Sequence, residues 1–239
     1  LISSSPKGSL FLLENLRFLN GEESNDKTLA GQLASLGDFY VNDAFAVSHR
    51  ANASVVAITK FLPSYAGLKL EAEIKNLSSV MKNPKKPLVV ILGGLKIKDK
   101  LKVIKNLKEK TSSFLVGGAL TAELLKLKLP KVIWPVDFRR NHENIIRDIG
   151  LKSEKLFSGK ILKARTVIWN GPVGDIGDRR FKSGTKAIVK AITQNKKAFK
   201  VAGGGETVMF LKKMKLDKKI DFISPGGGAM LDFLAGKKL

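Results

Sequence analysis

The sequence predicts an α/β fold: a parallel-sheet three-layer αβα sandwich whose second lobe is incomplete. Two observations predict it. From residue 86 onward, short apolar runs recur, and each is followed by glycines or a turn and then by a segment with helical spacing. Apolar runs without polar alternation are typical of strands that are buried on both faces, and repeated strand–helix units are typical of parallel sheets with right-handed crossovers.

Each run predicts one strand. The expected strands are 88–92, 114–116, 132–136, 166–169, 198–202 and 222–223. Helical spacing follows the glycine turns, for example in the apolar residues Leu101, Ile104 and Leu107 and again in Val208, Leu211 and Met214. We therefore interpret residues 84–239 as one lobe built around a buried parallel sheet.

The first part of the chain predicts fewer elements. We expect strands at 10–13 and 39–41 and a helix at 28–36. Because so few elements leave sheet edges unpaired, residues 1–67 are interpreted as the remnant of a lobe. Apolar residues at helical spacing then predict an interdomain helix over 68–83, with Leu70, Ile74, Leu77 and Met81 on one face.

Composition limits the possible functions. The 239 residues contain 43 Lys and Arg against 21 Asp and Glu, a formal net charge of +22. The absence of Cys excludes a thiol nucleophile or a Cys-ligated zinc site, and two His argue against a His-based metal cluster. No apolar stretch is long enough to predict a membrane span. We expect a cytoplasmic protein that attracts anions, and Leu1 suggests the downstream part of a longer protein.

The glycine turns predict where a ligand binds. Ligands of parallel sheets bind beyond the carboxyl ends of the strands, where glycine allows close backbone approach and helix N-termini attract anions. One such turn more often reflects packing, but several at one sheet edge favour a phosphate-bearing ligand. The turns comprise Gly93, Gly94, Gly117, Gly118, Asn170, Gly171, Pro172, Gly203, Gly204, Gly205, Gly226, Gly227 and Gly228.

Basic side chains accompany these turns. Lys96 and Lys100 follow the first glycine pair, and both are expected to face the same anion, although solvated surface lysines are the alternative. Arg17 and Arg50 could bind a phosphate or carboxylate in bidentate fashion, although surface roles are more common for isolated arginines. Asp43, next to a turn, is interpreted as a helix cap rather than an acid catalyst. Neither a Walker A nor a GxGxxG pattern is present.

Together these segments resemble the phosphoglycerate kinase family. The matching motifs run in order through LLENLRF, GEE, LASLGDFYVNDAF, SHRANAS, KFLPSYAG, VVILGGLKIKDKL, VGGA, PVD, VIWNGPVG, GTKA, GGGET and ISPGGGA. They span nearly the whole chain. The resemblance implies a two-lobed enzyme that moves a phosphoryl group between ATP and 3-phosphoglycerate, giving ADP and 1,3-bisphosphoglycerate, with Mg²⁺.

The resemblance also implies roles for residues. Residues 1–67 would belong to the phosphoglycerate-binding lobe, with Arg17 and Arg50 as substrate contacts, and residues 84–239 to the nucleotide-binding lobe. Lys96 and Lys100 would be catalytic, and Lys100 would also hold nucleotide phosphates. The remaining nucleotide contacts would come from the glycine turns named above and from Asn170, Pro172, Glu206 and Thr207, with Glu206 also near Mg²⁺. A monomer without membrane or nucleic-acid partners is implied.

Departures from the family pattern affect the expected activity. The motifs Asp-x-Asn and His-x-Gly-Arg-Pro are absent, and the stretch between Leu124 and Lys131 is short. Gly177 stands where the family has a ribose-binding glutamate, with Asp175 and Asp178 as possible substitutes, and Glu206 replaces an aspartate. We therefore expect a truncated, internally shortened member with little turnover by itself.

Two alternatives remain at this stage. One is a degenerate homologue that binds nucleotide without catalysis. The other is a basic nucleic-acid-binding protein, suggested by the net charge of +22. The lysines are dispersed along the sequence and few aromatic residues lie among them, which argues against this second alternative.

Overall fold

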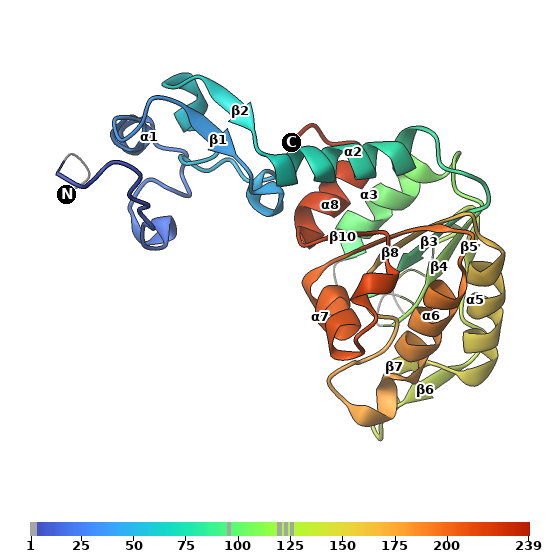
Figure 1. Ribbon diagram of the computed structural model, residues 1–239. Coiled ribbons are helices and arrows are strands. Elements are labelled where there is room, and N and C mark those ends of the chain that lie inside the picture. The colour runs from blue at the N-terminus through green and yellow to red at the C-terminus, as the bar shows by residue number, and fades with distance from the viewer. Residues whose placement is uncertain (1–3, 95–96, 119–120, 122–123, 125–126) are drawn as a thin grey trace. The chain divides into compact units, whose positions relative to one another are not determined.

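A computed structural model describes residues 4–94, 97–118, 121, 124 and 127–239. The chain divides into two compact units, an N-terminal unit of Leu1–Ile74 and a C-terminal unit of Lys75–Leu239 (Figure 1). Among the described residues, no helix is both long enough and apolar enough to cross a membrane.

The C-terminal unit contains the parallel sheet that the sequence predicts. Within the described residues it has six strands in the order β10-β9-β8-β3-β4-β5, and every neighbouring pair is parallel. The strands are β3 (Leu88–Leu92), β4 (Ser113–Val116), β5 (Val132–Ile133), β8 (Thr166–Asn170), β9 (Phe199–Gly203) and β10 (Phe222–Ser224). The order places β3 and β8 side by side, so the chain builds the sheet outward in both directions from this pair.

Helices lie around the sheet because both of its faces are apolar. Successive strand residues point to opposite faces, and all five residues of β3 are buried. Val89, Ile91 and Trp169 join one core cluster with side chains of α5, α6 and α7. α3 packs against α8, and α5 packs against α6. Figure 1 shows these two pairs on opposite sides of the sheet. The helices are α3 (Ile97–Leu107), α5 (Leu151–Lys163), α6 (Ser183–Gln194), α7 (Gly205–Lys213) and α8 (Gly227–Leu234). The predicted α/β fold class is confirmed.

Two details of this unit differ from the prediction. The strand expected at 132–136 ends at Ile133, because Pro135 cannot donate a ladder hydrogen bond. An antiparallel pair, β6 (Phe138–Arg140) and β7 (Ile146–Ile149), was not predicted. Two short 3₁₀ helices, η4 (Arg179–Phe181) and η5 (Asp217–Lys219), complete the unit.

The N-terminal unit has a small core of its own. α1 (Lys27–Ala34) and the 3₁₀ helix η3 (Ala57–Lys60) bury a cluster of Leu and Ala side chains together with Ile58. β1 (Tyr40–Asn42) pairs in parallel with β2 (Ser64–Ala66). The carboxylate of Glu22 is buried and accepts hydrogen bonds from the side chains of Asn52 and Ser54, which joins the GEE and SHRANAS motifs. The other 3₁₀ helices are η1 (Leu16–Phe18) and η2 (Phe45–Val47).

The strand predicted at 10–13 is wrong. These residues have no regular structure, and the side chains of Leu10 and Leu12 are 97% and 100% exposed. A strand requires a partner for its backbone N–H and C=O groups, and no strand pairs with 10–13 within the described residues. The apolar pattern alone did not specify such a partner.

A helix, α2 (Leu68–Lys82), covers nearly the whole of the predicted interdomain segment. Leu70, Leu77 and Val80 are buried, whereas Ile74 is 41% exposed, so its buried face is rotated from the predicted one. The division between the two units falls after Ile74, within this helix. The substrate and nucleotide roles of the two lobes stay predictions.

Candidate functional site

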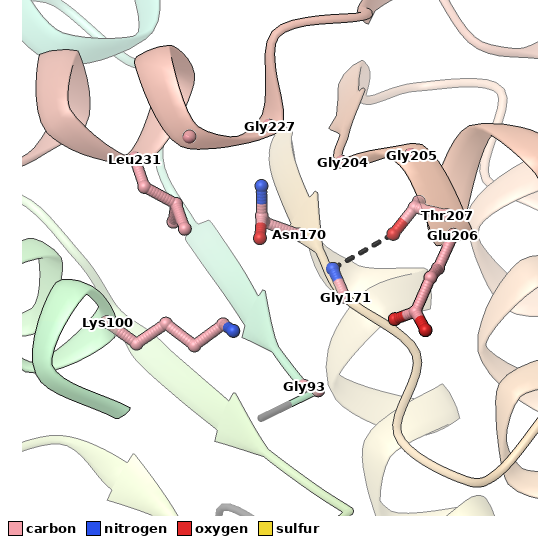
Figure 2. Close-up of a pocket in the computed structure, with 12 residues that line it drawn as sticks. Gly93, Lys100, Asn170, Gly171, Gly204, Gly205, Glu206, Thr207, Gly227 and Leu231 are labelled. Atoms are coloured by element: carbon pink, nitrogen blue, oxygen red, sulfur yellow. Dashed lines mark hydrogen bonds between the residues drawn. The ribbon is translucent and has the colours of Figure 1, made fainter. Parts of the chain in front are cut away.

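The largest set of predicted site residues meets at the carboxyl ends of β3 and β8. The strand order reverses between these two strands, and in open α/β sheets a crevice forms at such a switch point. A cavity of about 440 Å³ lies there (Figure 2). Its lining consists of Gly93, Gly94, Lys100, Asn170, Gly171, Gly204, Gly205, Glu206, Thr207, Gly227, Gly228 and Leu231.

Backbone contacts that only glycine allows bring these turns together. The amide of Gly93 donates to the carbonyl of Asn170 at 3.0 Å, and a side chain on Gly93 would overlap the backbone of Pro172. Gly171 has a φ of +90° and a Cβ there would overlap the backbone of Gly93. A Cβ on Gly227 would lie 2.6 Å from the Cα of Gly204. Larger residues would therefore push the walls of the cavity apart.

Helix N-termini supply the polar surface of the cavity. α7 begins at Gly205 and α8 at Gly227, and the first N–H groups of an α-helix have no partner within the helix. Such groups, with the positive end of the helix dipole, favour an anion. The hydroxyl of Thr207 is fully buried and accepts a 2.9 Å hydrogen bond from the amide of Gly171, which fixes α7 against the end of β8.

Two charged side chains point into the cavity. Lys100 lies in the first turn of α3 and is only 4% exposed. A Cβ on Gly94 would lie 3.6 Å from Nζ of Lys100 and 4.0 Å from Oε2 of Glu206. Figure 2 shows these two side chains extending into the cavity from opposite sides. The cavity therefore offers a cation, a carboxylate and helix N-termini around one set of glycine turns.

Five predicted residues do not line the cavity. Gly117 and Gly118 pack against Val173, and Gly203 packs against Met230. The carbonyl of Pro172 accepts a 2.9 Å hydrogen bond from the amide of Gly94, and Gly226 precedes the first turn of α8. These positions support the shape of the walls. Their role in binding stays a prediction.

Sequence reasoning missed Leu231. Its side chain lines the cavity from α8, one helical turn after the glycines at 227 and 228. The spacing of four residues from Gly227 was the signal that could have identified it, because residues i and i+4 share a helix face.

Metal-binding groups are sparse. Among the described residues, no cluster of three or more His, Asp or Glu side chains could hold a metal ion. Glu206 is the carboxylate that lines the cavity. Mg²⁺ commonly keeps several waters and binds through one or two carboxylates plus substrate phosphates, so this donor set fits Mg²⁺ carried by a phosphate ligand.

Comparisons with known proteins agree with this geometry. The family model described as phosphoglycerate kinase matches residues 1–134 and 131–237. A phosphoglycerate kinase of Dictyoglomus turgidum is 36% identical over 283 residues, covering 100% of this chain and 72% of the relative. The chain belongs to the phosphoglycerate kinase family. The resemblance inferred from the motifs is thereby confirmed, and the family consists of glycolytic phosphotransferases.

Further members of the phosphoglycerate kinase family support the assignment. A phosphoglycerate kinase of Koribacter versatilis is 40% identical and covers 98% of this chain and 70% of the relative. The crystal structure of the Pyrococcus horikoshii enzyme superposes with a TM-score of 0.84 at 29% identity, covering 94% of this chain and 69% of that chain. The chain thus spans about 70% of the length of these relatives.

Phosphoglycerate kinase motifs also assign catalysis or substrate binding to Lys96, Arg17 and Arg50. Lys96 lies outside the described residues. Arg17 and Arg50 belong to the N-terminal unit and are exposed, and Nε of Arg17 lies 3.9 Å from Oε1 of Glu23.

Gly177, which the motif comparison predicts to stand in place of a ribose-binding glutamate, lies in an exposed turn. The amide of Gly177 donates to Oδ1 of Asp175, whose carboxylate pairs with Arg147 at 3.5 Å. Asp178 pairs with Arg180 at 2.7 Å, and this contact lowers the pKa of Asp178 to about 2. Neither aspartate lines the cavity.

Proposed function

We propose that the cavity at the ends of β3 and β8 binds the phosphates of ADP or ATP, and that the chain takes part in reversible phosphoryl transfer between ATP and 3-phosphoglycerate. One observation carries the proposal. Lys100, Glu206 and the N-termini of α7 and α8 surround glycine turns that admit a phosphate close to the backbone.

Charge favours a phosphate ligand over a neutral one. A lysine near a helix N-terminus opposes the helix dipole, and Lys100 is also 96% shielded from solvent, being 4% exposed. An anion in the cavity compensates both costs. Asn170 and Gly171 would line the adenine side, and Leu231 would add apolar surface there.

The proposed chemistry requires no general base. The acceptor of 3-phosphoglycerate is a carboxylate that is already ionised at neutral pH, so catalysis rests on positioning and charge neutralisation. Lys100 would hold and stabilise the transferring phosphoryl group, together with Lys96. Glu206 would hold Mg²⁺ together with the nucleotide phosphates, and bound Mg²⁺ would supply neutralisation of phosphate charge.

The acceptor side is proposed for the N-terminal unit. Arg17 and Arg50 are exposed there, and guanidinium groups bind carboxylate or phosphate in bidentate fashion. The C-terminal unit would be the nucleotide lobe. We further propose a cytoplasmic monomer, as the glycolytic reaction implies.

Nucleotide binding is tested by calorimetry of Mg-ADP with the wild type and Lys100→Ala. Loss of a charged hydrogen bond to phosphate costs about 1–3 kcal/mol, so the affinity of the variant should fall about 5- to 150-fold. Lys102→Ala is the matched control. Lys102 lies on the same helix but is exposed and pairs with Asp99 at 3.9 Å, so its removal should leave the affinity within about 2-fold.

Two outcomes would contradict the proposal. Equal affinities of the wild type and Lys100→Ala would remove Lys100 from the site. No heat of binding at any Mg-ADP concentration tested would place the ligand outside the nucleotide class.

A further inference from the structure

A large part of the excess positive charge gathers at the amino-terminal edge of the six-stranded sheet. Six lead-in segments enter the strands there: 83–87, 108–112, 127–131, 163–165, 195–198 and 214–221. They contain thirteen Lys and Arg residues against three acidic ones, Glu109, Asp217 and Asp221. We name the thirteen the basic rim; all are exposed: Lys85, Lys86, Lys108, Lys110, Lys128, Lys131, Lys163, Arg165, Lys196, Lys197, Lys215, Lys218 and Lys219.

The opposite edge of the sheet differs in charge. The long segment 171–182 at the carboxyl edge carries three basic residues, Arg179, Arg180 and Lys182, against Asp175 and Asp178. Among the described residues, one member of the basic rim has a carboxylate within 4.0 Å of its charged group: Nζ of Lys108 lies 3.9 Å from Oε1 of Glu109. The charge of the rim is therefore largely uncompensated by neighbouring acids.

The dispersed lysines of the sequence thus become neighbours through the topology. A parallel sheet brings the segments before all of its strands to one edge, although Lys85 and Lys218 are 133 positions apart along the chain. With strands about 4.8 Å apart, six strands give an edge about 24 Å long. The basic rim follows this edge.

Two hollows lie between the basic side chains. One, of about 290 Å³, is lined in part by Lys85, Arg165 and Lys197. The other, of about 330 Å³, is lined in part by Lys131, Lys160 and Lys163. Within the part of the chain that the structure describes, no acidic residue lines either hollow. Cationic walls around hollows of this size fit phosphate groups that project from a polyanion.

The composition of the rim selects among polyanions. The six lead-in segments contain no aromatic residue, and Phe199, the aromatic residue that lines the first hollow, is partly buried in β9, which argues against a single strand bound by base stacking. Apart from Leu127, which is 41% exposed, their large apolar residues are not exposed, and the interfacial insertion that anchors proteins in membranes needs exposed apolar groups. A double helix presents phosphates along its outside and requires neither feature.

We propose that the basic rim binds double-helical nucleic acid through the phosphate backbone, without recognising base sequence. This goes beyond the phosphoryl-transfer function and uses the opposite edge of the sheet. It also departs from the expectation of no nucleic-acid partner, which rested on the dispersal of lysines along the sequence. The structure removes that objection, because the fold gathers them.

The test is fluorescence anisotropy of the 239-residue chain with a labelled DNA duplex of mixed sequence, about 24 base pairs long, between about 50 mM and 200 mM NaCl. Each phosphate that is neutralised contributes a slope of about −0.9 to log K against log salt. We expect a slope steeper than about −3, and equal affinity for a second duplex of unrelated sequence.

A charge-matched pair of triple variants locates the site. Lys85→Glu, Arg165→Glu and Lys197→Glu, combined, reverse three rim charges around one hollow. Lys152→Glu, Lys155→Glu and Lys186→Glu, combined, reverse three exposed charges on α5 and α6 outside the rim. The rim variant should bind the duplex at least about 10-fold more weakly and with a salt slope smaller by about 2.7, and the control variant within about 3-fold of wild type.

Several results would overturn the proposal. Equal weakening in both triple variants would mean that net charge alone attracts the duplex. Displacement of the duplex by Mg-ADP would place it in the cavity at the other edge. Tighter binding of the single strand, or binding of phosphatidylserine vesicles but not of the duplex, would assign the rim to a different polyanion. Unchanged thermal unfolding of both variants verifies that they fold.

Discussion

Asp148 is a fully buried carboxyl group in the C-terminal unit. Its Oδ2 accepts a 2.9 Å hydrogen bond from the amide of Gly184, and NH1 of Arg139 lies 3.7 Å away. Burial raises the pKa of Asp148 to about 6, although the hydrogen bonds from Gly184, Ile149 and Ser183 and the charge of Arg139 act in the opposite direction. Asp148 therefore takes up a proton more readily in the folded chain than in the unfolded one.

The sign of the resulting pH dependence follows from linkage. Between the ordinary pKa of 3.8 and about 6, the folded state binds more protons than the unfolded state. The contribution of Asp148 to the free energy of unfolding is therefore largest below pH ~4 and falls as the pH rises to about 6, by up to ~3 kcal/mol. Asp148→Asn should remove this contribution to the dependence of the free energy of unfolding on pH.

Urea unfolding at several pH values measures the effect. Tryptophan fluorescence reports the C-terminal unit, because Trp134 and Trp169 both lie in it. The difference in free energy between wild type and Asp148→Asn should change between pH 4 and 6; a constant difference would contradict the assignment. If the variant does not fold, an NMR titration of the Asp148 carboxyl in the wild type gives the same answer.

Single residues also show what the sequence could predict about the site. The glycine turns and Lys100 were identified because the physics of anion binding at helix N-termini leaves a local pattern. Gly117 and Gly203 have the same pattern but face Val173 and Met230. Which wall a glycine faces depends on tertiary packing, and this is absent from local sequence.

At the scale of elements, the start of α2 depends on a side chain distant in sequence. Oδ1 of Asp43 accepts hydrogen bonds from the amides of Lys69 at 2.6 Å and Leu70 at 3.0 Å. These amides belong to the first turn of the helix and have no partner within it. The interpretation of Asp43 as a helix cap is confirmed.

Asp43→Ala should loosen the first turn of α2. Loss of a cap costs about 1 kcal/mol, so amide hydrogen exchange of Lys69 and Leu70 should become about 5-fold faster. Asp38→Ala is the control, because Asp38 is exposed and makes no hydrogen bond to α2 among the described residues. Exchange that is unchanged in Asp43→Ala, or equally faster in both variants, would show that this cap does not stabilise the helix.

Elements with a strong apolar pattern in the sequence could be predicted. Elements that form only because they pair with another strand could not. β3 is apolar throughout, β8 has an apolar centre at Val167, Ile168 and Trp169, and both strands lie where the sequence places them. The antiparallel pair β6 and β7 contains Arg139, Arg140, Arg147 and Asp148, so it lacks the apolar signal of a buried strand. Residues 10–13 have that signal but pair with no strand in the described part of the chain, and they remain exposed.

At the scale of the whole molecule, the two units differ in how well their apolar surface is covered. Helices enclose the sheet of the C-terminal unit, and its strands are almost wholly buried. The N-terminal unit leaves Leu12, Phe18 and Phe39 more than half exposed. It also has an apolar hollow of about 420 Å³, which is lined in part by Leu13, Leu33 and Leu62. The acceptor half of the proposed reaction therefore depends on the less enclosed unit.

This asymmetry predicts separate outcomes for binding and turnover by the 239-residue polypeptide. It should bind Mg-ADP, because the residues of the cavity belong to the enclosed C-terminal unit. It should turn over 3-phosphoglycerate slowly, because the family motifs Asp-x-Asn and His-x-Gly-Arg-Pro are absent and the acceptor site is therefore incomplete. Positioning of the two reactants accounts for about 7–11 kcal/mol of a barrier in well-oriented reactions, so an incomplete acceptor site loses much of the rate.

A coupled assay of ATP consumption with and without 3-phosphoglycerate measures the turnover, and calorimetry of Mg-ADP on the same preparation measures binding. We expect that Mg-ADP binds and that the turnover rate is below about 1 s⁻¹, the lower end of typical enzyme rates. Robust turnover that depends on 3-phosphoglycerate would contradict it and would show that Arg17 and Arg50 suffice for the acceptor. Arg50→Ala, which should abolish any residual dependence on 3-phosphoglycerate while leaving Mg-ADP affinity unchanged, distinguishes a weak kinase from a homologue that binds only nucleotide.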